Sequence, residues 1–496
     1  MEEVVVAIAL PGLLAGLVSW WVPARAAKAV TVLAGVSSFV LSLALVSPVA
    51  RQGYIAAGGL FRVDSLGLVF LIASTFVYAL SAVFSAGYLS SPAGEGGGAF
   101  KGGGAGSRYG PRFLAGLNLF GWAMIVATMV DNLAILWIAI EVTTIVSALL
   151  VSMDDTDGSA EAAWKYVLIA SLGLGIALFA TILLYDAGTG VFGPVYSLTF
   201  MKLLSGAHRF APETVRLAYV LAVLGFGTKM GLFPVHTWLP DAHSEAPTPV
   251  SAMLSGALLA VSFYAILRYF QIAERTLGAG FPREVLLGFG VASLAFAALS
   301  VLAQRDLKRL LAYSSIEHMG ILAIGASFAA PVAIVGVLLQ VLAHAAAKST
   351  AFFGAGSIWK RLGTKELGQL RGVVGALPWT GPMLVLAILG LSGLPPFGIF
   401  RSEFLIVDGG LSSGGDWPAA ILVVLVVVAF LGLTWSSTKA MLTPAPEGTP
   451  VVRAEPSGLM AASMLVALVV LAVLGVHVPG DLSHLLARAA AELRAP

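Results

Sequence analysis

Long apolar stretches alternate with short clusters of charged, glycine and proline residues along almost the whole chain. A helix that crosses a lipid bilayer needs about 20 mostly apolar residues. About fourteen stretches have this length, and they run over residues 3–22, 28–47, 65–89, 112–130, 132–152, 163–185, 216–235, 248–270, 283–303, 309–329, 331–358, 380–408, 417–438 and 456–478. The pattern predicts an all-α polytopic membrane protein with about 14 transmembrane helices.

The polar segments outside these stretches predict little further folded structure. The first stretch begins Met-Glu-Glu and lacks a basic segment, so we expect it to stay in the protein and not to be a cleaved signal peptide. The glycine-rich segment 94–106 is typical of a flexible linker, and the acidic segment 154–157 of a solvated turn.

The end of the chain predicts one more helix. Residues 481–494 can form a short amphipathic helix, which we expect to lie at the membrane surface. Its apolar face would consist of Leu482, Leu485, Leu486 and Ala489.

Composition supports the same class of protein and excludes several functions. Hydrophobic residues make up 58% of the 496 residues, and charged residues only 11%, against about 25% in a soluble protein. The 28 basic and 26 acidic residues leave a net charge of +2, which gives no reason to expect a nucleic acid partner. Because the chain has no cysteine, it can hold no disulfide, no thiolate nucleophile and no Cys-ligated metal centre.

The seven histidines are scattered without metal-ligand spacing, so we predict no metal, no cofactor and no catalytic residue in this chain. Loops after odd-numbered stretches hold 14 Lys and Arg residues, and loops on the opposite side hold 10. Since cytoplasmic loops carry the excess of basic residues, both termini are predicted to face outward.

Ionisable residues inside the apolar stretches recur in the same order in two parts of the chain. The first set is Glu141, Lys165 and Lys229, and the second is Glu317, Lys348 and Glu403. The recurrence predicts two five-helix repeats, 111–272 and 273–440, preceded by a three-helix part, 1–110, and followed by the last helix and the tail, 441–496. An odd number of helices in each repeat makes the second repeat inverted relative to the first.

An ionisable side chain in the hydrocarbon region costs at least about 2.5 kcal/mol, so these residues are expected to face a polar interior. Burial favours the neutral form of Glu or Lys, and a nearby opposite charge favours the charged form. A Glu–Lys pair that can separate could therefore relay protons. The alternative is a set of static buried salt bridges that hold the helices together.

Proline residues are predicted to break two of these helices. Pro234 lies five residues after Lys229, and Pro395 and Pro396 lie shortly before Glu403. A proline removes a backbone donor, and backbone carbonyls freed at membrane depth are tolerated where they line a wet cavity. The alternative is a kink that serves packing alone.

Histidines are weaker candidates. His344 is four residues before Lys348 and so lies on the same helix face. His236 follows Lys229 by about two turns. These two, and with less support His318 beside Glu317, are candidate stations of a water wire; each could instead be a satisfied donor between helices.

Several long motifs resemble one known family. The motifs are GFGTKMGLFPVHTWLPDAH at 225–243, APTPVS at 246–251, DNLAILW at 131–137 and GLPPFGIFRSEF at 393–404. They resemble the antiporter-like proton-translocating membrane subunits of respiratory complex I and group 4 NiFe hydrogenases. The segments EAAWKY at 161–166 and DLKRLLAYSSIEHMG at 306–320 look most like hydrogenase-4 component F of formate hydrogenlyases, with the M-type subunit of complex I as the next most similar.

The resemblance implies roles for three residues: Glu141 as the carboxylate, Lys229 as its partner and gate, and Glu403 as the exit-side group. It also implies neighbouring membrane subunits, a peripheral redox module reached through them, and a prokaryotic plasma membrane. The chain departs from the family at Ala260, where the eighth helix commonly has a lysine. Arg401, two residues before Glu403, is a second point of doubt for that carboxyl, because a nearby cation favours the ionised form.

Two other functions stay open. One is a subunit of a multisubunit sodium/proton antiporter, which would exchange ions without a redox partner. The other is a non-pumping membrane scaffold for a peripheral hydrogenase, which the missing lysine at Ala260 favours.

Overall fold

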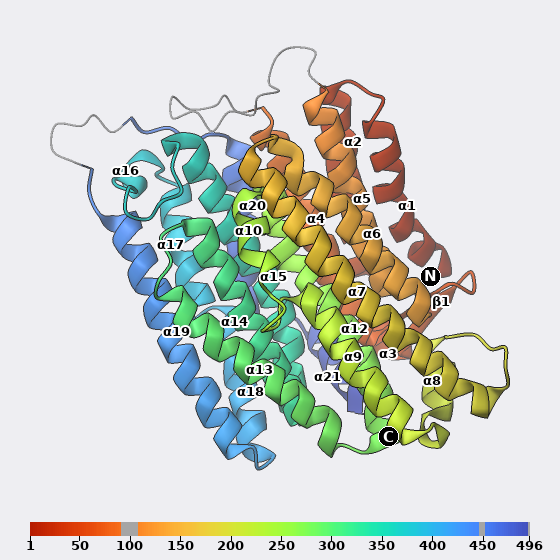
Figure 1. Cartoon of the computed structure of the whole chain (residues 1–496). Helices are drawn as coiled ribbons and strands as arrows, with labels where there is room; N and C mark the ends of the chain where they lie inside the picture. The colour runs from red at the N-terminus through yellow and green to blue at the C-terminus, as the bar shows by residue number, and fades with distance from the viewer. Residues whose placement is uncertain (91–107, 446–451, 495–496) are drawn as a thin grey trace.

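The computed structural model describes residues 1–90, 108–445 and 452–494, which form a bundle of long helices (Figure 1). The predicted linker at 94–106 lies outside the described residues. A short β-hairpin connects the second and third long helices, with Tyr54 opposite Asp64 in its register.

The elements of the described chain follow in sequence order. They are α1 (Glu2–Ser19), α2 (Ala24–Ala44), α3 (Val46–Gln52), β1 (Tyr54–Ala57), β2 (Phe61–Asp64), α4 (Ser65–Tyr88), α5 (Tyr109–Met129), α6 (Leu133–Val151), η1 (Ser152–Asp154), α7 (Asp157–Phe192), α8 (Phe200–Gly206), η2 (Ala207–Arg209), α9 (Pro212–Met230), α10 (Trp238–Glu245), α11 (Thr248–Met253), η3 (Leu254–Leu258), α12 (Leu259–Leu277), α13 (Gly280–Val301), α14 (Leu307–Phe328), α15 (Pro331–Leu362), α16 (Val373–Ala376), α17 (Thr380–Leu391), α18 (Gly398–Ser412), α19 (Asp416–Leu442), α20 (Gly458–Val476) and α21 (Gly480–Arg494).

Within the described residues, eleven helices are long and apolar enough to cross a membrane. The three remaining predicted stretches coincide with α9, α14 and the pair α17 and α18. α9 contains Lys229 and α14 contains Glu317, whereas α17 and α18 divide one stretch between them. The all-helical polytopic class is confirmed, and the number fourteen stays a prediction.

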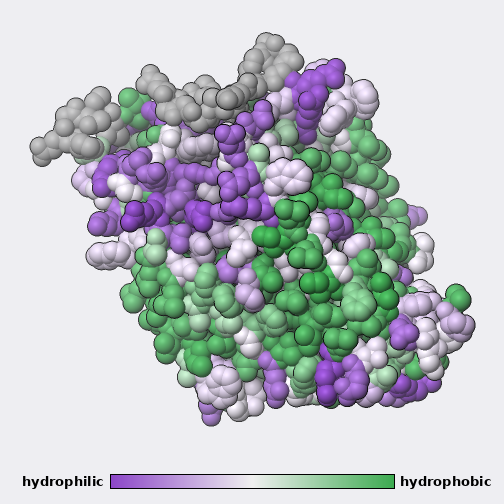
Figure 2. Space-filling model, in the orientation of Figure 1, coloured by the Kyte–Doolittle hydropathy of each residue, from purple (hydrophilic) through white to green (hydrophobic). Residues whose placement is uncertain are grey.

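α4, α12 and α15 form the centre of the bundle and are buried over nearly their whole apolar length. α1 and α2 lie on one flank and α19 on the opposite flank (Figure 1). Outward-facing apolar side chains on α7, such as Leu168 and Leu172, are more than half exposed. An apolar band covers the middle of the surface, and hydrophilic residues gather at its upper and lower ends (Figure 2).

Three helices are interrupted near the middle of the bundle. α9 ends at Met230, and the chain passes through Gly231, in the left-handed region, and Pro234 before α10 begins. α17 and α18 are separated by residues 392–397, which include Pro395 and Pro396. Between α11 and α12 the turn η3 is π-helical. Such turns leave backbone groups outside the regular ladder and are frequent at functional sites.

The predicted C-terminal amphipathic helix forms as α21. Its face with Leu485, Leu486 and Ala489 is buried against α3, α4 and α15. Burial of these side chains removes apolar surface from water and holds the helix at one end of the bundle. Its position at the membrane surface stays a prediction.

Gly225 of α9 allows this helix to cross α7 closely. A Cβ atom at position 225 would lie 2.6 Å from the backbone nitrogen of Ala177 and 2.7 Å from the carbonyl oxygen of Gly173. We expect Gly225→Ala to lower the free energy of unfolding by about 1–3 kcal/mol, because a packed backbone cannot give way. The midpoint of thermal unfolding of the purified chain in detergent measures this.

The matched control is Gly175→Ala on α7, where a Cβ would have no atom within 4 Å. Both substitutions raise the intrinsic helix propensity by the same amount, because each replaces glycine with alanine inside a helix. Equal midpoints for the two variants would contradict the close crossing.

Candidate functional site

Lys229 occupies the last turn of α9, directly before the break, and its side chain is completely buried. Its Nζ donates to Oγ1 of Thr144 on α6 at 2.8 Å and to the hydroxyl of Tyr166 on α7. The ammonium also lies 4.4 Å from the centroid of the Tyr166 ring. Tyr166 is bonded in turn to Oγ of Ser147 at 2.7 Å. Hydroxyl groups and an aromatic ring thus hold the ammonium.

Glu141 lies three residues before Thr144 on α6, about one helical turn away. Its Oε1 accepts a hydrogen bond from Oγ of Ser171 at 3.1 Å, and its buried Oε2 has no partner among the described residues. No ion pair joins Glu141 to Lys229 in the described part of the chain, because the ammonium is placed at the level of Thr144. The two groups are close but separated.

A second buried cluster combines α14, α15 and α18. Lys348 of α15 is completely buried, and its Nζ donates to the carbonyl oxygen of Leu311 at 2.8 Å and to the hydroxyl of Ser314. Glu317 lies three residues after Ser314 and is 3% exposed, with Oε2 unpaired within the ranges described. In both clusters a hydroxyl three residues from a glutamate, on the same helix, binds the lysine.

Histidines connect Glu403 to this second cluster. Nδ1 of His318 lies 4.0 Å from Oε1 of Glu403 and 3.0 Å from Nε2 of Gln340. Oε1 of Gln340 accepts a hydrogen bond from Ser402, the neighbour of Glu403. The ring centroids of His318 and His344 are 5.1 Å apart. Glu403, Gln340 and the two histidines thus form one contiguous polar group.

The break before α18 makes room for Glu403. Gly393 adopts φ +73°, and a Cβ at this position would lie 2.6 Å from Oε2 of Glu403. A larger residue would therefore displace the carboxyl group. Arg401 forms no ion pair with Glu403 in the part of the chain that the structure describes.

His243 of α10 lies between the two lysine clusters. On one side, the centroid of the Trp238 ring lies 5.9 Å from Nζ of Lys229 and 6.5 Å from the centroid of the His243 ring. On the other side, the His243 ring lies 5.4 Å from the ring of Phe352. Phe352 follows Lys348 by about one turn of α15. His243 is completely buried, and neither ring nitrogen has a partner among the described residues. It is thus a polar group placed between two lysines.

The interior position predicted for Lys165 is wrong. Its side chain is 47% exposed and pairs with Glu161 and, at 3.3 Å, with Asp241 of α10. Lys165 lies about two turns after the start of α7 at Asp157, on a face that leaves its side chain about half exposed. It belongs to a surface ion-pair group with Arg309, not to the interior row.

His236 is buried between aromatic rings in the segment between α9 and α10. The ring centroids of Phe233 and Phe296 lie 5.7 Å and 4.4 Å from its own. Its Nδ1 has no partner within the described chain. The structure places it next to the break, but outside the two lysine clusters.

Residues that the sequence did not single out complete the site. They are Thr144, Tyr166, Ser314 and Gln340, whereas His243 is already the last residue of the motif at 225–243. A periodic signal could have found Gln340, which precedes His344 and Lys348 by four and eight residues in an otherwise apolar helix. Among the residues described, no three His, Asp or Glu side chains gather in a way that could hold a metal ion.

Comparison with known proteins identifies relatives. Residues 130–431 match the family described as NADH:quinone oxidoreductase/Mrp antiporter, TM. The chain is 36% identical over 379 residues to a hydrogenase-4 component F homolog of Methylacidiphilum infernorum, covering 74% of this chain and 76% of that one. It is 33% identical over 363 residues to NADH-quinone oxidoreductase subunit N of Desulforudis audaxviator, covering 70% and 69%.

Solved structures share the fold. A chain of the archaeal membrane-bound sulfane sulfur reductase, a respiratory membrane complex, superimposes with a TM-score of 0.84 at 22% identity, over 99% of this chain and 97% of that one. The family resemblance inferred from the motifs is confirmed. The chain is a multi-pass membrane protein, and its structural neighbours are subunits of multisubunit membrane complexes.

The Gln340 bridge supports a prediction about stability. Gln340→Leu removes the amide group that binds Nδ1 of His318, whose side chain is completely buried. We expect the free energy of unfolding to fall by about 1–3 kcal/mol, because an unsatisfied buried polar group is costly. Thermal unfolding in detergent measures the change.

Gln304→Leu is the control, since Gln304 is half-buried and its side chain bonds, among the described residues, only to the carbonyl oxygen of Ser300. A shift for Gln304→Leu as large as that for Gln340→Leu would show that the bridge adds nothing specific.

Proposed function

Because the chain belongs to the NADH:quinone oxidoreductase/Mrp antiporter family of membrane subunits, we propose that it conducts protons across a prokaryotic plasma membrane within a redox-driven complex. The observation that carries this proposal is the pair of buried lysines, one near the half-buried Glu141 and one near the buried Glu317, with His243, His344 and His318 leading on to Glu403. Groups of this kind inside a membrane are costly and usually serve ion movement.

In the proposed cycle, a charge change in a neighbouring subunit alters the distance between Glu141 and Lys229. The arrangement in which Thr144 and Tyr166 bind the ammonium corresponds to the separated state. Without a nearby carboxylate, the buried ammonium releases its proton more easily. Lys229 then reloads from the opposite side.

The released proton moves along the middle of the membrane. His243 provides a basic nitrogen between Lys229 and Lys348, in a chain where Ala260 replaces the lysine common in the family. The route continues over His344 and His318 to Glu403. Since no hydrogen bonds between described residues join these stations directly, water must carry the proton between them.

The repeats and the sides of the membrane are part of the proposal. Residues 111–272 and 273–440 form two inverted five-helix units, each with one broken helix that bears an ionisable group, Lys229 or Glu403. Both termini face outward. The partners are other membrane subunits and, through them, a peripheral redox module of the hydrogenase or NADH dehydrogenase type, which holds the redox centres.

A sodium/proton antiporter subunit is the second candidate, because the matched family includes Mrp antiporters. It would exchange sodium for protons without electron transfer. A non-pumping scaffold is the third, because Ala260 lacks the usual lysine.

Replacement of the first pair tests the proposal. In the assembled complex in sealed vesicles, we expect Lys229→Met and Glu141→Gln each to lower the number of protons moved per electron pair, because each removes a titratable group. The stoichiometry is measured from the pH change per electron pair delivered. An unchanged stoichiometry with either variant would contradict the proposal.

Lys165→Met is the matched control, since it removes an exposed lysine of the adjacent helix. It should leave the stoichiometry unchanged. Co-purification of the partner subunits with every variant separates a pumping defect from an assembly defect, which is the outcome that the scaffold predicts.

The antiporter alternative has its own test. Our proposal predicts that proton movement in vesicles with the complex stops when electron transfer is inhibited, whatever the sodium gradient. Sodium-dependent proton exchange that persists without electron transfer would favour the antiporter.

A further inference from the structure

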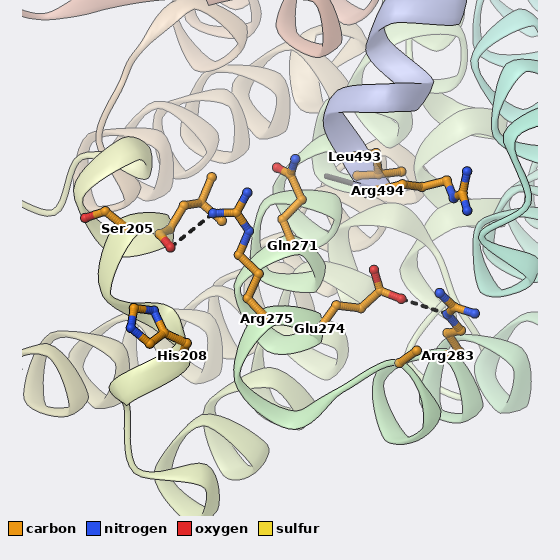
Figure 3. Close-up of a pocket in the computed structure, with 10 residues that line it drawn as sticks. Ser205, His208, Gln271, Glu274, Arg275, Arg283, Leu493 and Arg494 are labelled. Atoms are coloured by element: carbon orange, nitrogen blue, oxygen red, sulfur yellow. Dashed lines mark hydrogen bonds and ion pairs between the residues drawn. The ribbon is translucent and has the colours of Figure 1, made fainter. Parts of the chain in front are cut away.

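Two adjoining cavities open at the lower end of the bundle, where α8, α12 and α21 meet. One has a volume of about 410 Å³ and the other about 390 Å³. They share a wall formed by Leu204, Ser205, Gln271 and Arg275. Figure 3 shows the first cavity, with Ser205 on α8, Arg275 on α12 and Arg494 at the end of α21 arranged around it.

Arginine side chains dominate the lining. The two linings together contain three carboxylates, those of Asp64, Glu274 and Glu492. They contain six arginines, which are Arg62, Arg268, Arg275, Arg283, Arg488 and Arg494. Asp64 pairs with Arg268 at 2.6 Å and Glu274 with Arg283 at 2.7 Å, whereas Glu492 lies 3.8 Å from Arg488. The lining thus has an excess of positive charge.

Arg62 and Arg268 retain unused donors. The guanidinium of Arg62 stacks 3.4 Å from the centroid of the Tyr54 ring and forms no ion pair within the described ranges. Nε of Arg62 and Nε of Arg268 are buried without a hydrogen-bond partner there. Arg268 is only 3% exposed. Among the described residues, Arg62 therefore has no carboxylate that competes with an anionic ligand for its guanidinium.

Asp131 is a further carboxylate close to this region, and its Oδ1 accepts a hydrogen bond from the backbone N–H of Phe200 at 3.1 Å. Burial raises the pKa of Asp131, against the opposing effects of that hydrogen bond and of Arg62 and Arg268. Even with Asp131 fully ionised, the six arginines outnumber the four carboxylates. The positive excess therefore remains.

The cavities combine this charge with apolar side chains. Phe200, Met201 and Leu204 of α8 contribute to the lining, and Met201 is about half exposed. The lining also includes residues of β2, α12 and α13. A ligand here meets guanidinium groups and apolar side chains together.

We propose that these cavities bind the phosphate-bearing headgroup of an anionic phospholipid. Arginine forks match phosphate oxygens in two-point geometry, and basic pockets between membrane helices suit anionic headgroups. The apolar side chains of α8 receive the upper part of the acyl chains. Bound lipid fastens α21 to α8 and α12.

Native mass spectrometry of the full chain in detergent tests this with dioleoylphosphatidylglycerol, cardiolipin and dioleoylphosphatidylcholine as probes. We expect the two anionic lipids to remain bound in preference to phosphatidylcholine. Inorganic phosphate, which lacks acyl chains, should not displace them. Equal retention of phosphatidylcholine, or displacement by inorganic phosphate alone, would overturn the lipid assignment.

Arg62→Gln should weaken phosphatidylglycerol binding about fivefold, since one arginine at a membrane surface contributes about that factor. Ser205→Glu should weaken phosphatidylglycerol binding at least as strongly, because it adds a negative charge to the wall that the two cavities share. The hydrogen bond that this change removes is the one from the Ser205 hydroxyl to the carbonyl oxygen of Lys202. Arg216→Gln is the control, since this exposed arginine of α9 lies outside both cavities. Retention of phosphatidylglycerol by Ser205→Glu equal to that of the control would refute the site.

Discussion

Two lysine ammonium groups in the apolar interior set the constraint on which the rest of the structure depends. Each costs at least about 2.5 kcal/mol to place in the hydrocarbon region, so each must be compensated within the protein. Lys229 is bound by Thr144 and Tyr166, and Lys348 by Leu311 and Ser314. Because an ammonium has three N–H donors, one donor of each lysine is not committed to these partners. Neutral hydroxyls and a backbone carbonyl stabilise these ammonium groups without the fixed ion pair of a permanent salt bridge.

The interrupted helices create the places where such groups can face one another. The break after α9 lets Trp238 donate to the carbonyl of Thr228, a group of the last helical turn, and turns α10 so that His243 faces α15. The break before α18 brings Glu403 over Gly393. The π-helical turn η3 places Ser255 against Ser315 of α14 at 2.7 Å. The three irregular segments thus add polar contacts to those that Lys229 and Lys348 make with the regular helices α6, α7 and α14.

The sequence predicted the helices well, because apolar length is a strong signal and each stretch coincides with a helix or a helix pair. It also indicated the charged residues by their cost in such stretches. It placed Lys165 wrongly, because composition alone does not show which face of a helix a side chain occupies, and Lys165 lies on an exposed face beside Glu161 and Asp241. The sequence did not predict Thr144, Ser314 and Gln340 as site residues, because hydroxyl and amide side chains are common inside membrane helices. Only tertiary contacts show which of them bind a lysine or a histidine.

The central claim is that the buried polar groups around Lys348 become hydrated while the complex works. Since the chain has no natural cysteine, a single introduced cysteine reports water access without background. Ser314→Cys places a thiol at the hydroxyl next to Lys348, and Leu322→Cys places one in the apolar part of the same helix. During electron transfer, a small membrane-impermeant thiol reagent should label position 314 and not 322. Equal absence of labelling at both positions during turnover would contradict a hydrated proton route.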